Sequence, residues 1–447
     1  MLTRRSLLAT SAALAMSCGR AKPPVSQPVQ LNVAAYLGLV TMDMRRMGCY
    51  EAAYEDVVAA LEQDPDNPFG PNRGRYRLAM RYSDEFFPGT TWESPADDAL
   101  DAVAAFLEEL EADLVTVWPE LAQWLGRRGL LLPLNQFSGG ESLEREFFPV
   151  ALDRYHADGT LYALPVSAAP LMVYYHTGHF RRQGVPLVDA SWDWDDLAEN
   201  GAKLTTYDKE GRVTRWGLVA HFDEVWWALW QNGAEALDPD TVSCRLQEPE
   251  AVTAMQFFHD LTHRHHASPA AWAIDLFDIL NATPPAMRYD YADVWLDPAI
   301  YRVAALPRGK QFVVPVRDGF GIGITTQTPR TEAAYTALQG LVRAMQTQVT
   351  MPARREAVAS LRRAKFDPQP EELEAIKRSL ENGRALPQTL LEGLTMGVAT
   401  EALVKGRDVA TAVNEACGAL RKYQDSADIP PQLPLKPNPW GYCESAR

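Results

Sequence analysis

The sequence predicts an α/β protein whose sheets are mainly parallel and flanked by helices, and three observations support this fold class. Short β-prone runs alternate with helical segments over much of the chain, which is typical of parallel strands joined by crossover helices. The last third, from residue 331 to 423, has the pattern of successive helices interrupted by prolines. The 447 residues are 47% hydrophobic and 23% charged, the composition of a folded globular chain.

In the first part of the chain, strands and helices alternate at short intervals. Strands are expected at 30–36, 76–82 and 113–118, and a helix at 52–61. Ser94 and Pro95 form a good helix start, and apolar residues at helical spacing follow as far as Leu110. Ligands of parallel sheets bind beyond the carboxyl ends of strands. The residues expected to contact a ligand here are Tyr36, Trp118 and Glu120.

The middle of the chain repeats this alternation with more aromatic residues. Strands are expected at 171–175, 215–219, 286–289 and 320–325, and a long helix at 249–267. Aromatic and amide or carboxylate side chains gather after two of these strands. A sugar ring has an apolar face for aromatic packing and a rim of hydroxyls for polar groups. We therefore expect ligand contacts from Trp226, Trp230, Asn232, Tyr289, Asp290 and Tyr291; core packing is the alternative for each tryptophan.

The overall charge and the cysteines exclude several classes of protein. Lysine and arginine number 43 against 58 aspartates and glutamates, a net charge of −15, which is the wrong sign for a nucleic-acid-binding protein. The five cysteines are far apart and form no C-x-x-C motif, so neither a zinc site nor a disulfide pairing follows from their spacing. These cysteines are Cys18, Cys49, Cys244, Cys417 and Cys443.

The amino-terminal segment has the pattern of an export signal. Arg4 and Arg5 precede an apolar run over residues 7–16, which is typical of a signal peptide and too short to span a bilayer. The paired arginines resemble a twin-arginine signal, although ordinary secretory signals also contain such pairs.

The end of this segment, Leu14 to Cys18, resembles a bacterial lipoprotein box. We therefore expect a signal peptide at 1–17, a lipid on Cys18 that anchors the chain to a membrane, and a tether at 18–27. The protein would be periplasmic or on the cell surface. The alternative is a soluble secreted protein cleaved near Ala13 or Ala15.

Several segments together resemble the family 1 extracellular solute-binding proteins of ABC transporters. They are YALPVSAAPLMVYYHTGHFRRQGVP with SWDWDDLAENGAKLT within 159–204, DLVTVWPELAQWLGRRGLLLPL from 113, WALWQNGAEALDPD from 227 and RDGFGIGITTQTPRTEAAYTAL from 317. Their order along roughly residues 28–425 carries the resemblance. Residues 37–48 and 64–74 depart from the family's pattern.

The resemblance implies a two-lobed periplasmic-binding-protein fold that closes over a ligand. Lobe one would comprise 28–163 plus 309–345, and lobe two 164–308 plus 346–427, followed by a tail at 428–447. A hinge is expected near Leu164-Pro165 and Leu306-Pro307, and the family's ligand-facing turn falls on Gly319 and Phe320. The implied function is capture of a sugar or related solute by a monomer, which delivers it to the permease subunits of an importer.

Catalytic signatures are missing from the sequence. It contains no G-x-x-x-x-G-K-[ST], G-x-G-x-x-G or G-x-S-x-G motif, so no catalytic residues, no cofactor and no metal are expected. His259 and His263 have zinc-ligand spacing on a helix, but Asp260 stands where a zincin needs glutamate, which favours a solvated histidine face. The second hypothesis is a secreted carbohydrate hydrolase with Glu120 and Asp290 as paired carboxylates.

Overall fold

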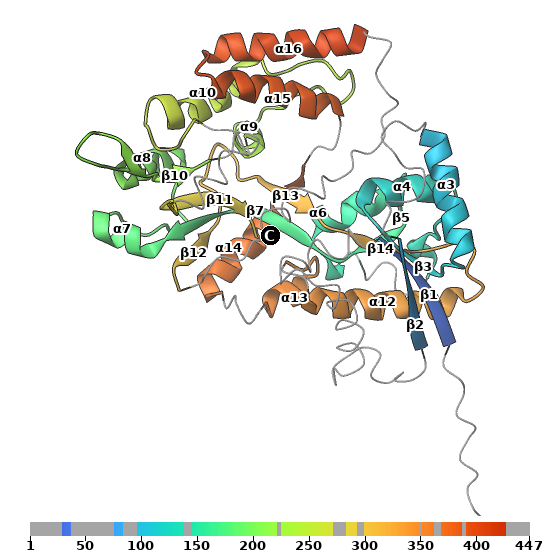
Figure 1. Ribbon diagram of the computed structural model, residues 1–447. Coiled ribbons are helices and arrows are strands. Elements are labelled where there is room, and N and C mark those ends of the chain that lie inside the picture. Colours follow the sequence, from blue (N-terminus) through green and yellow to red (C-terminus); the bar gives the residue numbers. More distant parts are fainter. Residues whose placement is uncertain are drawn as a thin grey trace, which may run out of the picture.

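The structure is a computed structural model with two large sheets, each surrounded by its own helices, that form two lobes (Figure 1). It describes residues 29–36, 76–83, 96–137, 143, 145–220, 225–270, 283–292, 299–348, 351–361, 368–386 and 390–425. Among these residues, no helix is both long and apolar enough to cross a membrane.

The first sheet has the strand order β2-β1-β3-β14-β6. Its strands are β1 (Val29–Tyr36), β2 (Tyr76–Ser83), β3 (Leu114–Val117), β6 (Ala163–Pro165) and β14 (Gly321–Ile324). The first three are parallel, as expected, and β14 runs antiparallel to both β3 and β6. The longer helices of this lobe are α3 (Ala96–Glu109), α4 (Pro119–Arg127) and α12 (Thr331–Gln348).

Asp113 connects the first sheet to the chain that returns after β14. Its side chain is 1% exposed, and its carboxylate accepts hydrogen bonds from the Asn32 amide at 2.8 Å and from Arg330 at 3.2 Å. A buried carboxylate is stable only when it is paired in this way. The contact therefore fixes β1 and β3 to the start of α12.

The second sheet has the order β10-β11-β7-β13-β15, and β12 also pairs with β7. Its strands are β7 (Ala168–His176), β10 (Leu218–Val219), β11 (Met287–Tyr291), β12 (Tyr301–Ala304), β13 (Val314–Asp318) and β15 (Gly383–Ala385). The central strand β7 is antiparallel to β11, β12 and β13, whereas β10 with β11 and β13 with β15 are parallel pairs, so this sheet is mixed.

Helices cover the second sheet, and two of them stack at the top of the lobe in Figure 1, α15 and α16. The helices are α7 (Thr177–Gln183), α8 (Trp194–Leu204), α9 (Trp226–Gln231), α10 (Pro249–His263), α14 (Pro370–Glu381), α15 (Leu390–Val404) and α16 (Val409–Asp425). The short elements are α6 (Pro149–Leu152), α13 (Arg355–Ala359), β4 (His156–Ala157), β5 (Thr160–Leu161), β8 (Thr206–Tyr207) and β9 (Val213–Arg215).

Most expected elements that fall on described residues are present, with differences at their ends. The strand expected at 215–219 is interrupted at Gly217, where a Cβ would lie 1.8 Å from the Gly201 carbonyl oxygen. The helix expected to reach residue 267 ends at His263, and His266 has a positive φ of 50°. The helix expected at 52–61 lies outside the described residues.

Three chain segments cross between the lobes and are hydrogen-bonded to one another. The Val166 amide donates to Phe320 O at 2.8 Å, and the Ala353 amide donates to Val166 O at 3.2 Å. Gly319 lies against Ser167, and a Cβ on it would be 1.7 Å from Ser167 Oγ. Only glycine therefore fits this crossing without a shift of its neighbour.

The crossings correct one expectation about the hinge. Pro165 ends β6 directly before a crossing, as expected. Leu306-Pro307 lies within the second lobe instead, because the chain after it first forms β13 of the second sheet and crosses only after Asp318. The sequence pattern did not distinguish β13, an inner strand of the second sheet, from a crossing strand.

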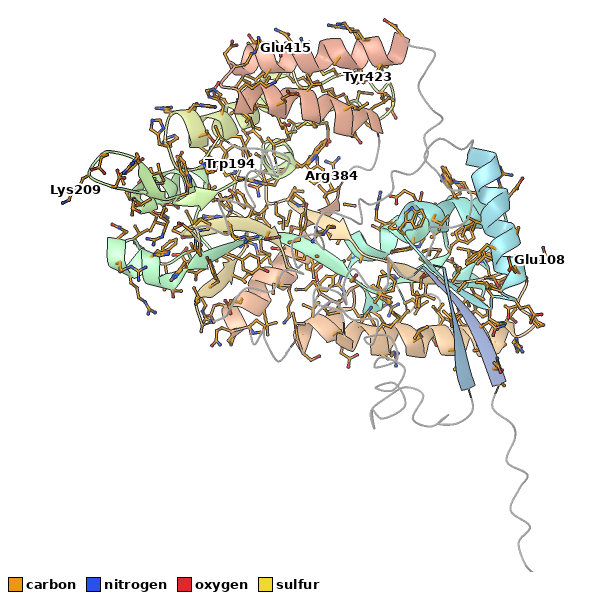
Figure 2. All side chains as sticks on the ribbon, in the orientation of Figure 1. Glu108, Trp194, Lys209, Arg384, Glu415 and Tyr423 are labelled. Carbon is orange, nitrogen blue, oxygen red and sulfur yellow. A yellow bond between two sulfur atoms is a disulfide. The ribbon has the colours of Figure 1, made fainter. Side chains whose placement is uncertain are left out.

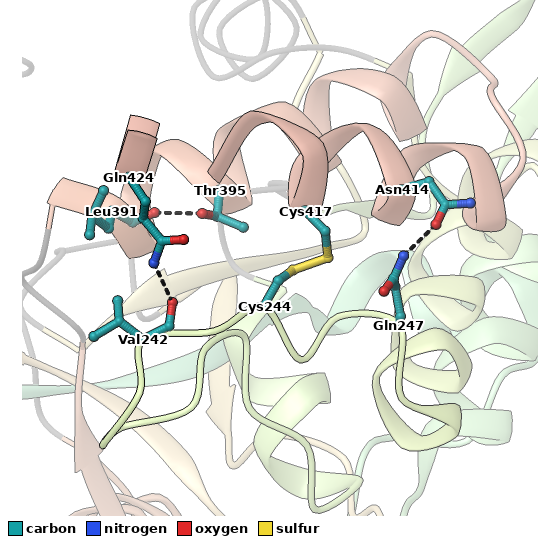
Figure 3. Close-up of a disulfide and its surroundings, with 8 residues drawn as sticks. All are labelled: Val242, Cys244, Gln247, Leu391, Thr395, Asn414, Cys417 and Gln424. Carbon is teal, nitrogen blue, oxygen red and sulfur yellow. Dashed lines mark hydrogen bonds between the residues drawn. A yellow bond between two sulfur atoms is a disulfide. The ribbon is translucent and has the colours of Figure 1, made fainter. Parts of the chain in front are cut away.

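A disulfide joins Cys244 to Cys417, a pairing that the sequence left open (Figure 3). It attaches the loop after α9 to α16, and Gln424 on the same helix donates to Val242 O at 2.9 Å. Cys18, Cys49 and Cys443 lie outside the described residues.

Candidate functional site

The carboxyl ends of strands from both sheets meet at the crossings. Val117, the last residue of β3, pairs with Gly321, and Asp318, the last residue of β13, pairs with Ala168. The strands β1, β11 and β15 run in the directions that bring their carboxyl ends to the same region. This is the place where α/β sheets bind ligands.

Arg384 and Trp230 form the clearest feature on the second lobe. The Arg384 guanidinium lies over the Trp230 ring, 4.3 Å from its centroid, and its two terminal nitrogens donate to the Glu235 carboxylate at 2.6 and 2.8 Å. Figure 2 shows Arg384 on the side of this lobe that faces the first lobe. Trp230 itself is 1% exposed, so its ring supports the guanidinium from below.

An arginine also covers the ring of Tyr291, namely Arg317. The Arg317 guanidinium lies 4.3 Å from the centroid of the Tyr291 ring. The strand register places Tyr291, Arg317 and Arg384 on one face of the second sheet. Two aromatic rings, Tyr291 at the end of β11 and Trp230 on α9, are therefore each covered by an arginine.

Asp290 points to the opposite face of the sheet from Tyr291, because side chains alternate along a strand. Its carboxylate forms an ion pair with Arg288 and accepts a hydrogen bond from the Tyr291 amide at 3.0 Å. Tyr289 shares the face of Tyr291 but is 1% exposed, with its ring centroid 5.6 Å from that of Trp227.

The remaining predicted residues of α9 differ in their exposure. Trp226 is half-buried at the start of the helix, with its ring centroid 5.9 Å from that of Trp230. Asn232 is buried and donates from its side chain to Glu250 O at 2.6 Å. Of Trp226, Trp230 and Asn232, it is therefore Trp226 whose ring is partly exposed and can contact a ligand.

On the first lobe, Trp118 and Glu120 lie where β3 passes into α4. Trp118 is 5% exposed, and Glu120 forms an ion pair with Arg154. The neighbouring Tyr155 hydroxyl donates to Gly319 O at 3.3 Å, so this corner of the lobe contacts the crossing. Phe320 is buried in the crossing itself. Tyr36 ends β1, but its side chain lies outside the described residues.

Arg317, Arg384 and Glu235 were missed by reasoning from the sequence. Arg317 lies two residues before Gly319 of the expected ligand-facing turn, so its position in the sequence could have indicated it. Arg384 lies on β15, a strand of three residues in a region whose pattern was helical. Its approach to Trp230 joins residues 154 positions apart, which no local pattern reports.

The histidines and the paired carboxylates have other partners. A ring nitrogen of His263 is 2.9 Å from Leu403 O, and no group of three or more His, Cys, Asp or Glu side chains in the described part of the chain could hold a metal ion. Glu120 and Asp290 each bind an arginine, whereas a glycosidase needs one protonated carboxyl directed at the substrate.

Comparison with known proteins identifies the family. The model of the bacterial extracellular solute-binding proteins matches residues 91–338, more than half of the chain. The solved structures that resemble it include the cyclic α-maltosyl-1,6-maltose binding protein of Arthrobacter globiformis, at a TM-score of 0.62 and 16% identity over 88% of this chain and 98% of that one.

Two further similar structures differ in their bound molecules. One is an ABC substrate-binding protein of Listeria monocytogenes in complex with cycloalternan (TM-score 0.59, 17% identity, 89% and 99% of the two chains). The other is UgpB of Mycobacterium tuberculosis in complex with glycerophosphocholine (TM-score 0.57, 16% identity, 89% and 98%). At identities this low, the structural similarity shows the two-lobed fold alone. The family match shows that this chain is a member of the bacterial extracellular solute-binding proteins of ABC transporters.

Proposed function

We propose that this protein captures a carbohydrate between its two lobes and delivers it to the permease subunits of an ABC importer, without catalysis. The observation that carries the proposal is the pair of arginines, Arg384 and Arg317, each of which lies over an aromatic ring, Trp230 of α9 and Tyr291 at the end of β11. Guanidinium and carboxylate groups bind sugar hydroxyls, and the exposed part of Trp226 provides an apolar surface for a ring. Several structural relatives are described as complexes with maltose-type sugars, which supports this ligand class.

The test is a ligand screen followed by one variant. Maltotriose, cyclic and linear oligosaccharides, monosaccharides and glycerol phosphodiesters are compared by thermal shift, because a ligand that binds only the native state raises its stability. We expect at least one oligosaccharide to bind, Arg384→Ala to weaken it about tenfold or more, and no sugar product to form. Binding only of a glycerol phosphodiester would contradict the carbohydrate class, and turnover would favour the hydrolase.

We also propose how the chain is divided and anchored. Lobe one would comprise 28–163 and 319–345, and lobe two 164–318 and 346–427. The pairing of β13 with β7 favours a return to lobe one at residue 319, whereas the sequence predicts it at residue 309. Residues 1–17 would be removed and Cys18 lipidated, with 18–27 as a tether. Cys18→Ala should release the protein from the membrane or leave it unprocessed, while ligand affinity is unchanged.

A further inference from the structure

A cluster of basic side chains lies at the end of lobe two that is far from the crossings. His176 ends β7, eight residues from the crossing at Ala168, which corresponds to about 26 Å at the rise of a strand. Its backbone amide donates to Ala286 O at 2.8 Å, and its register partner on β12 is Tyr301. Figure 1 shows this end of the sheet, with α7 beside it, on the side of lobe two away from the first lobe. The cluster is therefore separate from the proposed sugar site.

Two arginines at this end each have a buried nitrogen without a hydrogen-bond partner. Arg215 ends β9, two residues before Gly217, whose carbonyl accepts from the Met287 amide of β11 at 2.9 Å. Arg288 is the next residue of β11. The Nε atoms of Arg215 and Arg288 are both buried and unpartnered within the described part of the chain. A buried N–H group without a partner is costly, so both atoms need an acceptor that a ligand can supply.

The same two arginines make the electrostatic field at this end positive. Arg288 forms an ion pair with Asp290, while Arg215 forms no ion pair with any described residue. Burial raises the pKa of Tyr301, and the charges of Arg288 and Arg215 act against it by lowering this pKa. No described carboxylate adds to the effect of burial on Tyr301. An anion near the Tyr301 ring is therefore attracted.

Two histidines add hydrogen-bond donors. The rings of His176 and His179 lie 3.8 Å apart between centroids. Nδ1 of His176 accepts from the Gly178 amide at 3.1 Å, and Nδ1 of His179 contacts Arg182, whose guanidinium can only donate. In the neutral rings the proton is therefore on Nε2, and each Nε2–H is a donor.

The mutual influence of these groups shows that they form one cluster. Burial first, and then the charges of His176, Arg215 and Arg182, lower the pKa of His179 to about 4. Arg182 and Arg215 act in the same direction on the pKa of His176. Donors from α7, β7 and β9 therefore lie close to one another. His179 is 6% exposed and Arg182 is exposed, so the cluster has a buried side and a side open to solvent.

We propose that this cluster is a second ligand site, which binds the phosphate group of a soluble molecule. An arginine presents Nε–H and a terminal N–H side by side, which match two phosphate oxygens. Arg215 has both groups available, and Arg288 offers its Nε–H while its terminal nitrogen remains with Asp290. The Nε2–H groups of His176 and His179 are donors for a third acceptor oxygen of the phosphate. The proposal does not depend on the identity of the ligand in the cleft.

The test titrates inorganic phosphate into the full mature chain by calorimetry and thermal shift, at neutral pH and constant ionic strength. We expect saturable binding and a rise in the Tm, with no such effect of chloride. Arg215→Gln should weaken phosphate binding about tenfold or more, and Arg182→Gln about threefold, through loss of charged hydrogen bonds. The matched control is Arg212→Gln, which removes the same charge from an arginine already paired with Asp208; it should have no effect on phosphate.

Two readouts distinguish phosphate binding from a purely structural role of Arg215. Without phosphate, Arg215→Gln should not lower the Tm, because it removes an unpaired charge whose Nε is buried. With phosphate, the rise in Tm that the parent shows should be absent from this variant. Phosphate should also raise the pKa of His179 by about one unit or more in an NMR titration of the parent, because a nearby anion favours the imidazolium.

Two further measurements make the outcome specific to this site and to a soluble ligand. Arg384→Ala, in the proposed sugar site, should leave phosphate binding unchanged, so failure of one site is distinguishable from failure of the other. Glycerol 3-phosphate should also bind, whereas vesicles of phosphatidic acid should not, since the chain has a net charge of −15 and is repelled by an anionic surface. No binding of phosphate, equal binding by Arg215→Gln and the parent, or binding to the vesicles alone would overturn the proposal.

Discussion

Replacement of Gly319 by alanine should destabilise the protein, because this glycine lies where two crossing segments touch. A Cβ there would be 1.7 Å from Ser167 Oγ, 2.9 Å from its Cβ and 3.0 Å from its carbonyl oxygen. The first contact is the closest and forces the Ser167 hydroxyl out of its present position. The other two atoms move only if the crossing moves. Overpacking of this kind costs about 1 to 3 kcal/mol, and we expect Gly319→Ala to lower the free energy of unfolding by this amount.

The assay is urea denaturation followed by tryptophan fluorescence, with a double-mutant cycle. Ser167→Ala removes the Oγ contact, so the double variant should recover at least about 0.5 kcal/mol relative to additivity. The control is Gly418→Ala in α16, where a Cβ meets nothing within 4 Å; it should stabilise by about 0.5 to 1 kcal/mol through helix propensity. A Gly319→Ala variant as stable as the parent, with no coupling to Ser167, would refute the reasoning.

Three other changes have expected outcomes. Trp230→Ala should lower the free energy of unfolding by about 3 to 5 kcal/mol, since the ring is 1% exposed; a loss below about 1 kcal/mol in denaturation would contradict the packing. Reduction of Cys244–Cys417, which are 173 residues apart, should cost up to about 5 kcal/mol by chain entropy, and an unchanged Tm would argue against the bond. Burial lowers the pKa of His179 to about 4 from 6.5, so the unfolded chain binds the proton more tightly. The free energy of unfolding should therefore decrease as the pH is lowered from 6.5 to 4. His179→Gln should make this decrease smaller, and an equal decrease in both proteins would show that His179 does not contribute.

Helices and strands with a clear periodicity could be predicted from the sequence. The apolar stripe after Ser94 predicts a helix, and Val103 and Leu107 of α3 are buried in the core. The run at 30–36 forms β1. These elements depend on neighbours within a few positions, which the sequence displays directly. β15 has three residues, too few to establish a period.

The candidate site was predicted in position but not in detail. The rule that ligands bind after strands located Tyr291 and the α9 segment, and both lie at the strand ends near the crossing. It did not show that Trp230 is covered by Arg384 or that Asp290 is engaged by Arg288. These contacts depend on which strands become neighbours, and the pairing of β13 with β15 joins segments almost 70 positions apart.

Small-angle scattering with a bound oligosaccharide tests the central claim, that a carbohydrate is captured between two lobes that close on it. The protein is measured alone and when saturated with the tightest oligosaccharide from the thermal-shift screen, with saturation established by calorimetry. We predict a smaller radius of gyration in the complex, because hinge closure brings the lobes together, and recovery of the sugar unaltered. An unchanged radius of gyration at saturation, or the absence of binding by every oligosaccharide tested, would contradict the account.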